Sequence, residues 1–150
     1  MKSKSIASAY QSVKKFSEIA GVLDNPTYET VDLYNSLAFE ELSESITALE
    51  ENNPVEILDG AIDEFYIVCG KLAILDKMGY NVEEGIRRVC ENNLSKFPEI
   101  GFTQEYVPDN HSQTFNKKHK VYVLKNENGK VKKPHGFKPV SLSDLVPVVV

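Results

Sequence analysis

Hydrophobic side chains recur at spacings of three and four along the first 93 residues, which is the pattern of amphipathic helices. In residues 5–20 this pattern comprises Ile6, Tyr10, Val13, Phe16 and Ile19. In residues 28–51 it comprises Val31, Tyr34, Leu37, Leu42, Ile46 and Leu49. The segment "GVLDNP" lies between the two runs and breaks the first. The pattern therefore predicts two amphipathic helices joined by a short connection.

A third run, residues 54–78, is hydrophobic on nearly all sides. Pro54 suits the first turn of a helix, and Gly79 suits the position just after its end. A helix with so little polar surface belongs in the centre of a helical protein. Asn81 then suits the cap of a fourth helix that extends to about residue 93.

The character of the chain changes after residue 97. Residues 98–120 are polar and aperiodic, which predicts a loop, and residues 121–133 predict a hairpin around Asn128 and Gly129. "PHGFKP" predicts a turn, and "SLSDLV" a last helical turn. We expect an all-α, four-helix bundle-like fold with an irregular, partly extended C-terminal tail. Residues 1–97 would form the metal- and nucleotide-binding body, and residues 98–150 a loop and basic tail of the same domain.

Charge divides the chain in the same way. The formal net charge is −5, but residues 1–100 hold 9 Lys/Arg and 18 Asp/Glu, whereas residues 101–150 hold 8 and 4. An acidic helical body with a basic tail suits a protein that holds a metal and a polyanion together. The overall negative charge gives no reason to expect nucleic-acid binding.

Cysteine usage and the N-terminus predict a cytoplasmic protein. Cys69 and Cys90 lack CxxC spacing and lie in apolar or helical surroundings, so we expect free, buried thiols in a reducing compartment. The N-terminus lacks the apolar run of a signal peptide. No segment approaches the roughly 18 apolar residues of a membrane span, so no membrane association is expected.

Acidic side chains face one another on the second and third predicted helices. Glu41 and Glu44 are three residues apart, and Asp59 and Asp63 four apart, so each pair shares one helix face. The short break at residues 52–54 implies that the helices pack antiparallel. Glu41 and Glu44 then lie roughly opposite Asp63 and Asp59.

Four carboxylates beside apolar residues repel one another, and burying them without a partner is costly. A divalent cation resolves both problems, and ligation by oxygen alone favours Mg²⁺, Mn²⁺ or Ca²⁺ over zinc. A diiron bundle needs Glu-x-x-His pairs, but the three histidines all lie in the tail. The alternative is a solvated acidic face without a ligand.

These residues resemble those of the all-α nucleoside triphosphate pyrophosphatases, which include MazG-like proteins, dimeric dUTPases and phosphoribosyl-ATP pyrophosphohydrolases. The family pattern is EExxE, a spacer, then ExxD. Here "EELSE" supplies Glu40, Glu41 and Glu44, followed by an apolar helix with acidic residues at its start. Residues 59–96 and the Gly-Lys-rich, Pro-containing tail at residues 126–145 also resemble those of the family.

The resemblance implies Mg²⁺-dependent hydrolysis, with Mn²⁺ as a substitute, of a nucleoside triphosphate to a monophosphate and pyrophosphate. It implies Glu41, Glu44, Asp59 and Asp63 as metal ligands, with Glu40 or Glu44 orienting or deprotonating the attacking water. A strict ExxD occurs as Glu56-x-x-Asp59. Alignment of the apolar run nevertheless places the family's last Asp at Asp63 and Gly60 where its Glu would fall. Glu56 is therefore the alternative to Asp59.

Carboxylates cannot hold phosphates, so the substrate needs cations from elsewhere in the chain. Lys96, Lys130 and Lys133 are the main candidates, Lys71 is a weaker one, and Asn93 is a candidate hydrogen-bond partner. A four-helix chain of this size often completes its core by association, so a homodimer or homotetramer is expected. Two alternatives remain: a hydrolase of another pyrophosphorylated metabolite, such as a guanosine alarmone, or a catalytically silent helical module that binds a nucleotide or protein.

Overall fold

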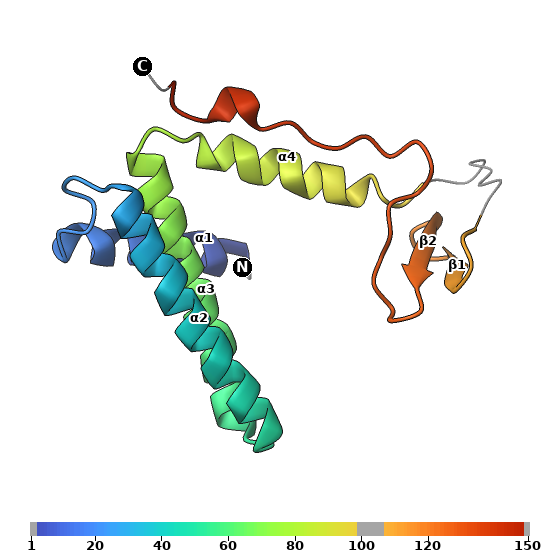
Figure 1. Ribbon diagram of the computed structural model, residues 1–150, viewed down its shortest axis with the longest axis horizontal. Helices are drawn as coiled ribbons and strands as arrows, with labels where there is room; N and C mark the ends of the chain where they lie inside the picture. Colours follow the sequence, from blue (N-terminus) through green and yellow to red (C-terminus); the bar gives the residue numbers. More distant parts are fainter. Residues whose placement is uncertain (1–2, 99–106, 149–150) are drawn as a thin grey trace. The chain divides into compact units, whose positions relative to one another are not determined.

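The computed structural model describes residues 3–98 and 107–148 (Figure 1). Contacts group the chain into two compact units, residues 1–82 with 146–150 and residues 83–145. Within the described residues the chain forms four α-helices, α1 (Ser3–Ile19), α2 (Tyr28–Glu50), α3 (Pro54–Lys77) and α4 (Val82–Leu94). A hairpin of β1 (His111–Asn116) and β2 (Val121–Asn126) and a short 3-10 helix (Ser143–Leu145) follow. The all-α class with a partly extended tail is thus confirmed.

The first unit is built on the antiparallel pair α2 and α3, which lie side by side (Figure 1). The turn between them is short because Asn52 adopts a left-handed conformation (φ 53°) and Asn53 caps α3. The Asn53 Oδ1 atom accepts hydrogen bonds from the backbone N–H groups of Val55 and Glu56, at 3.2 and 3.3 Å. Pro54 fits the first turn because it has no N–H to leave unpaired. The predicted antiparallel packing is therefore confirmed.

Two glycines of α3 allow the close approach of α2. A Cβ atom added at Gly70 would lie 2.4 Å from Tyr34 Cε1, and one at Gly60 would lie 2.6 Å from Ser45 Oγ. Both glycines are buried. Tyr34 thereby joins a core cluster with Leu23, Ala73 and Ile74. Gly60 is thus a packing residue that lies against Ser45.

Helix α1 packs on α3. Phe16 meets Tyr66 edge to face, with ring centroids 5.9 Å apart. Lys14 Nζ lies 3.7 Å from Asp76 Oδ2, a half-exposed pair that contributes little to stability.

In the second unit, residues 141–144 run along α4 and are held there by Arg88 (Figure 1). The Arg88 guanidinium donates to both carboxylate oxygens of Asp144, at 2.7 and 2.8 Å, and to the Ser141 carbonyl at 3.2 Å. Hydrogen bonds from Arg87 and Arg88 lower the pKa of Glu84 to about 2. The guanidinium of Arg88 thus links α4 to the C-terminal stretch.

One predicted element is wrong. Residues 111–116, expected within a loop, form β1, which pairs with β2 from His111–Asn126 to Asn116–Val121. The turn at Gly129 (φ 79°) exists, but beyond it the chain makes a single bridge, between Lys125 and Val131. The sequence "HSQTFN" has no hydrophobic alternation, so its strand depends on pairing with the more apolar β2. The rest of the predicted loop includes residues 99–106, which lie outside the described residues.

The first compact unit ends at residue 82, whereas the predicted boundary between body and tail lies at residue 97. Residues 83–97 group with the tail because α4 contacts it: Asn92 Nδ2 donates to the Lys138 carbonyl at 2.7 Å, and Leu145 lies beside Gly85. The predicted single domain of residues 1–150 stays a prediction.

Both cysteines are free thiols. Cys69 is buried, and burial raises its thiol pKa. Cys90 is exposed, so the prediction that both would be buried is wrong for this residue. None of the described helices combines the length and the apolar character that crossing a membrane requires.

Replacement of Gly70 by alanine should destabilise the first unit. The added methyl group overlaps the Tyr34 ring, so we expect a loss of about 1–3 kcal/mol in the free energy of unfolding, measured by urea denaturation. Gly85→Ala is the matched control, because the nearest atom to its added Cβ lies at 3.8 Å and alanine favours a helix by roughly 0.5–1 kcal/mol. Equal effects of the two substitutions would contradict the proposed packing.

Candidate acidic site between α2 and α3

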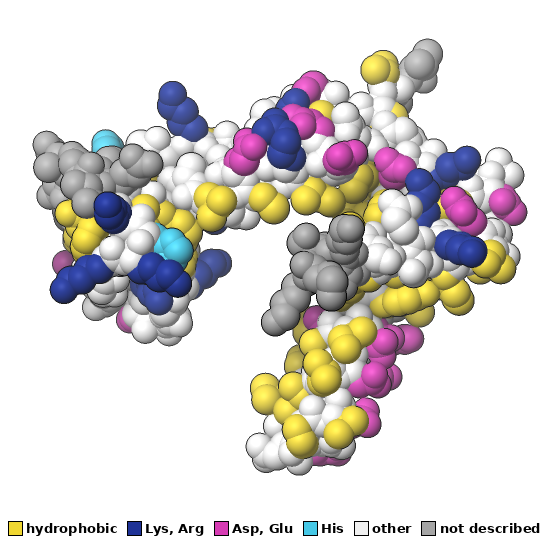
Figure 2. Space-filling model, turned by 180° about the vertical axis from the view of Figure 1, so that it is seen from behind, with side chains coloured by type: hydrophobic (Ala, Val, Ile, Leu, Met, Phe, Trp, Pro, Cys, Tyr) yellow, Lys and Arg dark blue, Asp and Glu magenta, His cyan; other side chains and the backbone are white. Residues whose placement is uncertain are grey.

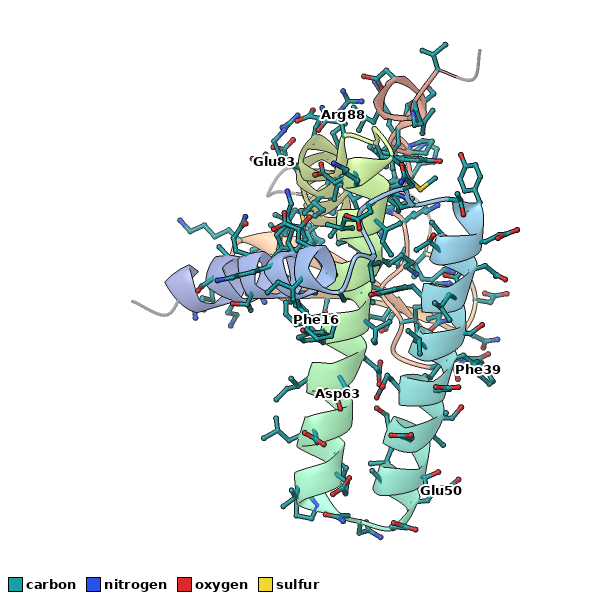
Figure 3. All side chains as sticks on the ribbon, turned by 90° about the vertical axis from the view of Figure 1, so that its left-hand side faces the viewer. Phe16, Phe39, Glu50, Asp63, Glu83 and Arg88 are labelled. Atoms are coloured by element: carbon teal, nitrogen blue, oxygen red, sulfur yellow. The ribbon has the colours of Figure 1, made fainter. Side chains whose placement is uncertain are left out.

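The predicted metal ligands lie on the two paired helices of the first unit. Glu41 and Glu44 belong to α2, and Asp59 and Asp63 to α3. Figure 3 shows the two helices side by side, with Asp63 partway along α3 and Glu50 close to the turn that joins them. We call Glu41, Glu44, Asp59 and Asp63 the acidic site.

Burial separates these carboxylates into two kinds. Glu41 and Asp63 are half-buried, whereas Glu44 and Asp59 are exposed. Glu41 continues a run of buried or half-buried α2 residues, Tyr34, Ala38, Ser45 and Ala48, spaced by three or four along the side that meets α3. The acidic site therefore extends from the contact between the helices to the adjoining surface.

Ser45 and Glu64 hold this contact together. The Ser45 hydroxyl donates a hydrogen bond to Glu64 Oε1 across the helix pair. Gly60 lies against the same serine. Glu64 of α3 thus has a neutral hydrogen-bond partner in Ser45. Asp59 and Asp63 remain for interactions with other groups.

The electrostatics of Glu41 show that the acidic side chains act on one another. Its pKa is raised, first by partial burial and then by the negative charges of Asp63, Glu44, Glu40 and Asp59. The two residues from α3 are those that the antiparallel arrangement predicted. The structure therefore brings the predicted carboxylates within electrostatic range of one another.

The arrangement of side chains is not that of a formed metal centre. Among the described residues, no three His, Cys, Asp or Glu side chains are grouped closely enough to hold a metal ion together. The donor chemistry nevertheless fits a hard divalent cation, because every candidate ligand is a carboxylate. Mutual repulsion at Glu41 is also the condition that such a cation would relieve.

Glu44 also lines a cavity of about 320 Å³ toward the turn between the helices. Glu51 and Glu56 line it too, with the hydroxyl groups of Ser43 and Thr47. Asp59 is not among its lining residues. Glu56 therefore shares a cavity with Glu44, whereas Asp59 acts on Glu41.

The candidate cations lie in both units. Lys71, in the same unit as the acidic site, donates to Asn35 Oδ1 at 3.2 Å. Asn93, Lys96, Lys130 and Lys133 belong to the other unit. Lys96 Nζ donates to Asn93 Oδ1 at 2.7 Å, which brings two predicted substrate-binding residues together. Lys130 is exposed in the turn after β2.

Sequence reasoning missed the aromatic residue that joins two of these lysines. Lys133 Nζ and Lys96 Nζ lie 5.4 and 6.0 Å from the centroid of the Phe137 ring. The segment "PHGFKP" held a weak signal, an aromatic residue followed by a lysine in a turn, but the approach of Lys96 depends on tertiary contacts. Tyr34 of the hydrophobic pattern on α2 is buried in the core and does not present its ring to a ligand.

A hydrophobic surface adjoins the acidic one. Exposed side chains spaced by three or four form one stripe on each helix, Phe39, Leu42, Ile46 and Leu49 on α2 and Val55, Leu58, Ile62 and Phe65 on α3. Phe39 is 71% exposed and points away from α3 in Figure 3. Figure 2 shows hydrophobic side chains on the helix pair with acidic ones along its edge. We call these eight residues the apolar stripes.

Comparisons with known proteins assign no family. The chain is similar to a prophage-derived-like uncharacterized protein, YozM, of Bacillus subtilis (strain 168), with 28% identity over 92 residues that cover 60% of this chain and 73% of that protein. No family model and no solved structure matches the chain.

Neutralising Glu41 should stabilise the metal-free protein. A raised pKa means that the folded state holds the proton more tightly than the unfolded chain, so the free energy of unfolding falls as pH rises from about 4.5 through the raised value. Glu41→Gln removes this penalty, and we expect a higher melting temperature at pH 7 in chelator and a flatter dependence on pH.

Glu50→Gln, an exposed residue on the same helix, is the control. Excess Mg²⁺ should reduce the difference between Glu41→Gln and the unchanged protein, because the cation relieves the same repulsion. A lower melting temperature for Glu41→Gln in chelator would contradict this account of the site.

Proposed function

We propose that this protein is a cytoplasmic, Mg²⁺-dependent nucleoside triphosphate pyrophosphohydrolase that converts its substrate to a monophosphate and pyrophosphate. The observation that carries the proposal is the placement of carboxylates from both helices around the half-buried Glu41, whose pKa is raised first by its burial and then by their negative charges. A protein gains nothing for its own stability from repulsion at a half-buried position. Such repulsion is useful when a cation completes the site.

Each carboxylate has a role in this proposal. Glu41, Glu44, Asp59 and Asp63 would hold Mg²⁺ or Mn²⁺ through their oxygens. When bound, the metal neutralises phosphate charge and lowers the pKa of a water molecule. Glu40, which is exposed beside the site, or Glu44 would orient that water and accept its proton. The water oxygen forms a new bond to phosphorus, the α–β anhydride bond breaks, and pyrophosphate leaves.

Two alternatives use the same geometry. Hydrolysis of a guanosine alarmone would need the same carboxylates with a different phosphorylated substrate. A catalytically silent module would bind a nucleotide or protein without turnover. Metal-dependent chemistry separates these three possibilities.

The decisive experiment is a pyrophosphate-release assay on a panel of ribo- and deoxyribonucleoside triphosphates and a guanosine alarmone, with Mg²⁺, Mn²⁺ or chelator. We expect a monophosphate and pyrophosphate in metal and none in chelator. Glu44→Gln and Asp63→Asn should lower kcat by at least about a hundredfold, whereas Glu50→Gln should not. Turnover that persists in chelator, or no turnover with any metal, would contradict the proposal.

The same assay decides between Glu56 and Asp59. If Asp59 is the ligand, Asp59→Asn should raise the Mg²⁺ concentration needed for half-maximal activity by about tenfold, and Glu56→Gln should change it little. The reverse order would assign the metal to the cavity that Glu44 and Glu56 line.

We expect the active form to be a homo-oligomer, built on the apolar stripes. Each stripe has the 3-4 spacing of a helix that packs against another, yet its residues are 41–71% exposed. Exposed apolar surface of this extent on two neighbouring helices is costly in water. A second copy of the same hairpin would cover it and complete a bundle of four helices.

Sedimentation measures this association directly. Ile62→Lys places a charge within the stripe of α3 and should shift the protein from dimer or tetramer toward monomer. Leu33→Lys is the control, since Leu33 is exposed on α2 but lies outside the stripe. A monomeric unchanged protein at all concentrations would refute the proposal.

A further inference from the structure

The second unit contains a cavity of about 320 Å³ that lies apart from the acidic site in the chain. Its lining includes Asn92, Ser95, His135, Phe137 and Lys138. The Asn92 side chain donates to the Lys138 carbonyl at 2.7 Å, which ties the turn to α4. Phe137 N–H closes this turn by donating to the Pro134 carbonyl at 3.2 Å. Hydrogen bonds therefore fix the turn that forms one wall of the cavity and join it to α4.

Phe137 presents an aromatic ring in a strongly basic setting. Lys133 Nζ and Lys96 Nζ lie 5.4 and 6.0 Å from its centroid, near the outer limit of about 6 Å for a cation–π contact. Contacts at this limit are weak, so the ammonium groups can turn to an anion. Residues 130–138 contain four lysines and no acidic residue. Figure 2 shows Lys and Arg side chains gathered in the region of the β1–β2 hairpin.

An aromatic face beside lysines suits a ligand with a flat ring and phosphate groups. A nucleobase stacks on an aromatic side chain, and ammonium groups pair with phosphates. The cavity volume is at the lower end of the range for small-molecule sites, which favours a single nucleotide over an extended strand. Lys96 and Lys133 are not lining residues of the cavity, so the Phe137 ring is the group that joins the cavity to these two lysines.

We propose that the cavity at Phe137 binds a nucleoside phosphate, with its base on the Phe137 ring and its phosphates on Lys96 and Lys133. The choice of a nucleoside triphosphate as the ligand rests on the proposed function. The site itself depends on no metal, because its cations are lysines. Lys130, exposed in the turn after β2, has no contact with this ring among the contacts of the described residues.

The test is calorimetric titration of the full chain with a nucleoside triphosphate in chelator, where the acidic site has no cation to hold phosphate. We expect binding that Phe137→Leu and Lys133→Gln each weaken by about tenfold. Phe115→Leu and Lys125→Gln are matched controls, since both residues are exposed on the hairpin of the same unit, and they should leave the affinity unchanged. Circular dichroism checks that each variant is folded.

Three further arms make the result specific. Inorganic triphosphate should bind more weakly, with a loss in Lys133→Gln but none in Phe137→Leu, because it has no base to stack. Absence of nucleotide binding in chelator would overturn the proposal. A single-stranded oligonucleotide that binds far more tightly than the nucleotide, and loses affinity in Phe115→Leu, would replace the pocket with a strand-binding surface.

Failure of this inference and of the proposed function can be told apart. Asp63→Asn should abolish metal-dependent hydrolysis and keep binding in chelator. Phe137→Leu should weaken binding in chelator and leave kcat for metal-dependent hydrolysis nearly unchanged. Binding in chelator without hydrolysis by the unchanged protein would support the pocket and reject the enzyme. Hydrolysis with Mg²⁺ but no binding in chelator would reject the pocket alone.

Discussion

The close contact of α2 with α3 is the constraint on which the first unit depends. Gly60 and Gly70 leave room on α3 for Ser45 and Tyr34 of α2, where any larger residue would push the helices apart. This spacing places Glu41 within reach of the charges on α3 and lets the serine hydroxyl meet Glu64. The approach of Glu41 to the acidic residues of α3 therefore depends on these two glycines, which have no side chain to hold the helices apart.

The helix pair divides its surface by chemistry. The contact between the helices is small and polar near the acidic site and apolar near Tyr34, Ala73 and Ile74. Hydrophobic residues that would usually fill such a contact lie on the outside instead, in the apolar stripes. The core of the isolated chain is consequently small, and the proposed association would supply much of the missing burial.

The sequence predicts the helices well because their spacing of three and four is a local property. The sequence also predicted that Glu41 and Asp63 lie opposite each other, because a short turn between two helices requires them to pack antiparallel. Strand β1 did not, because "HSQTFN" becomes a strand only against β2. The packing role of Gly60, the exposure of Cys90 and the cluster at Phe137 depend on contacts between distant residues, which no periodicity encodes.

The ion pair between Arg88 and Asp144 makes the second unit sensitive to ionic strength. The Arg88 guanidinium, about a quarter exposed, holds the C-terminal stretch through Asp144, which is 60% exposed. Salt screens charges in contact with water, with a Debye length of about 8 Å at 0.15 M and roughly 3 Å at 1 M. Concentrated salt therefore weakens the hold of α4 on residues 141–144, whereas the steric fit of Gly70 to Tyr34 is insensitive to it. Salt alone thus acts unequally on the two units of this chain.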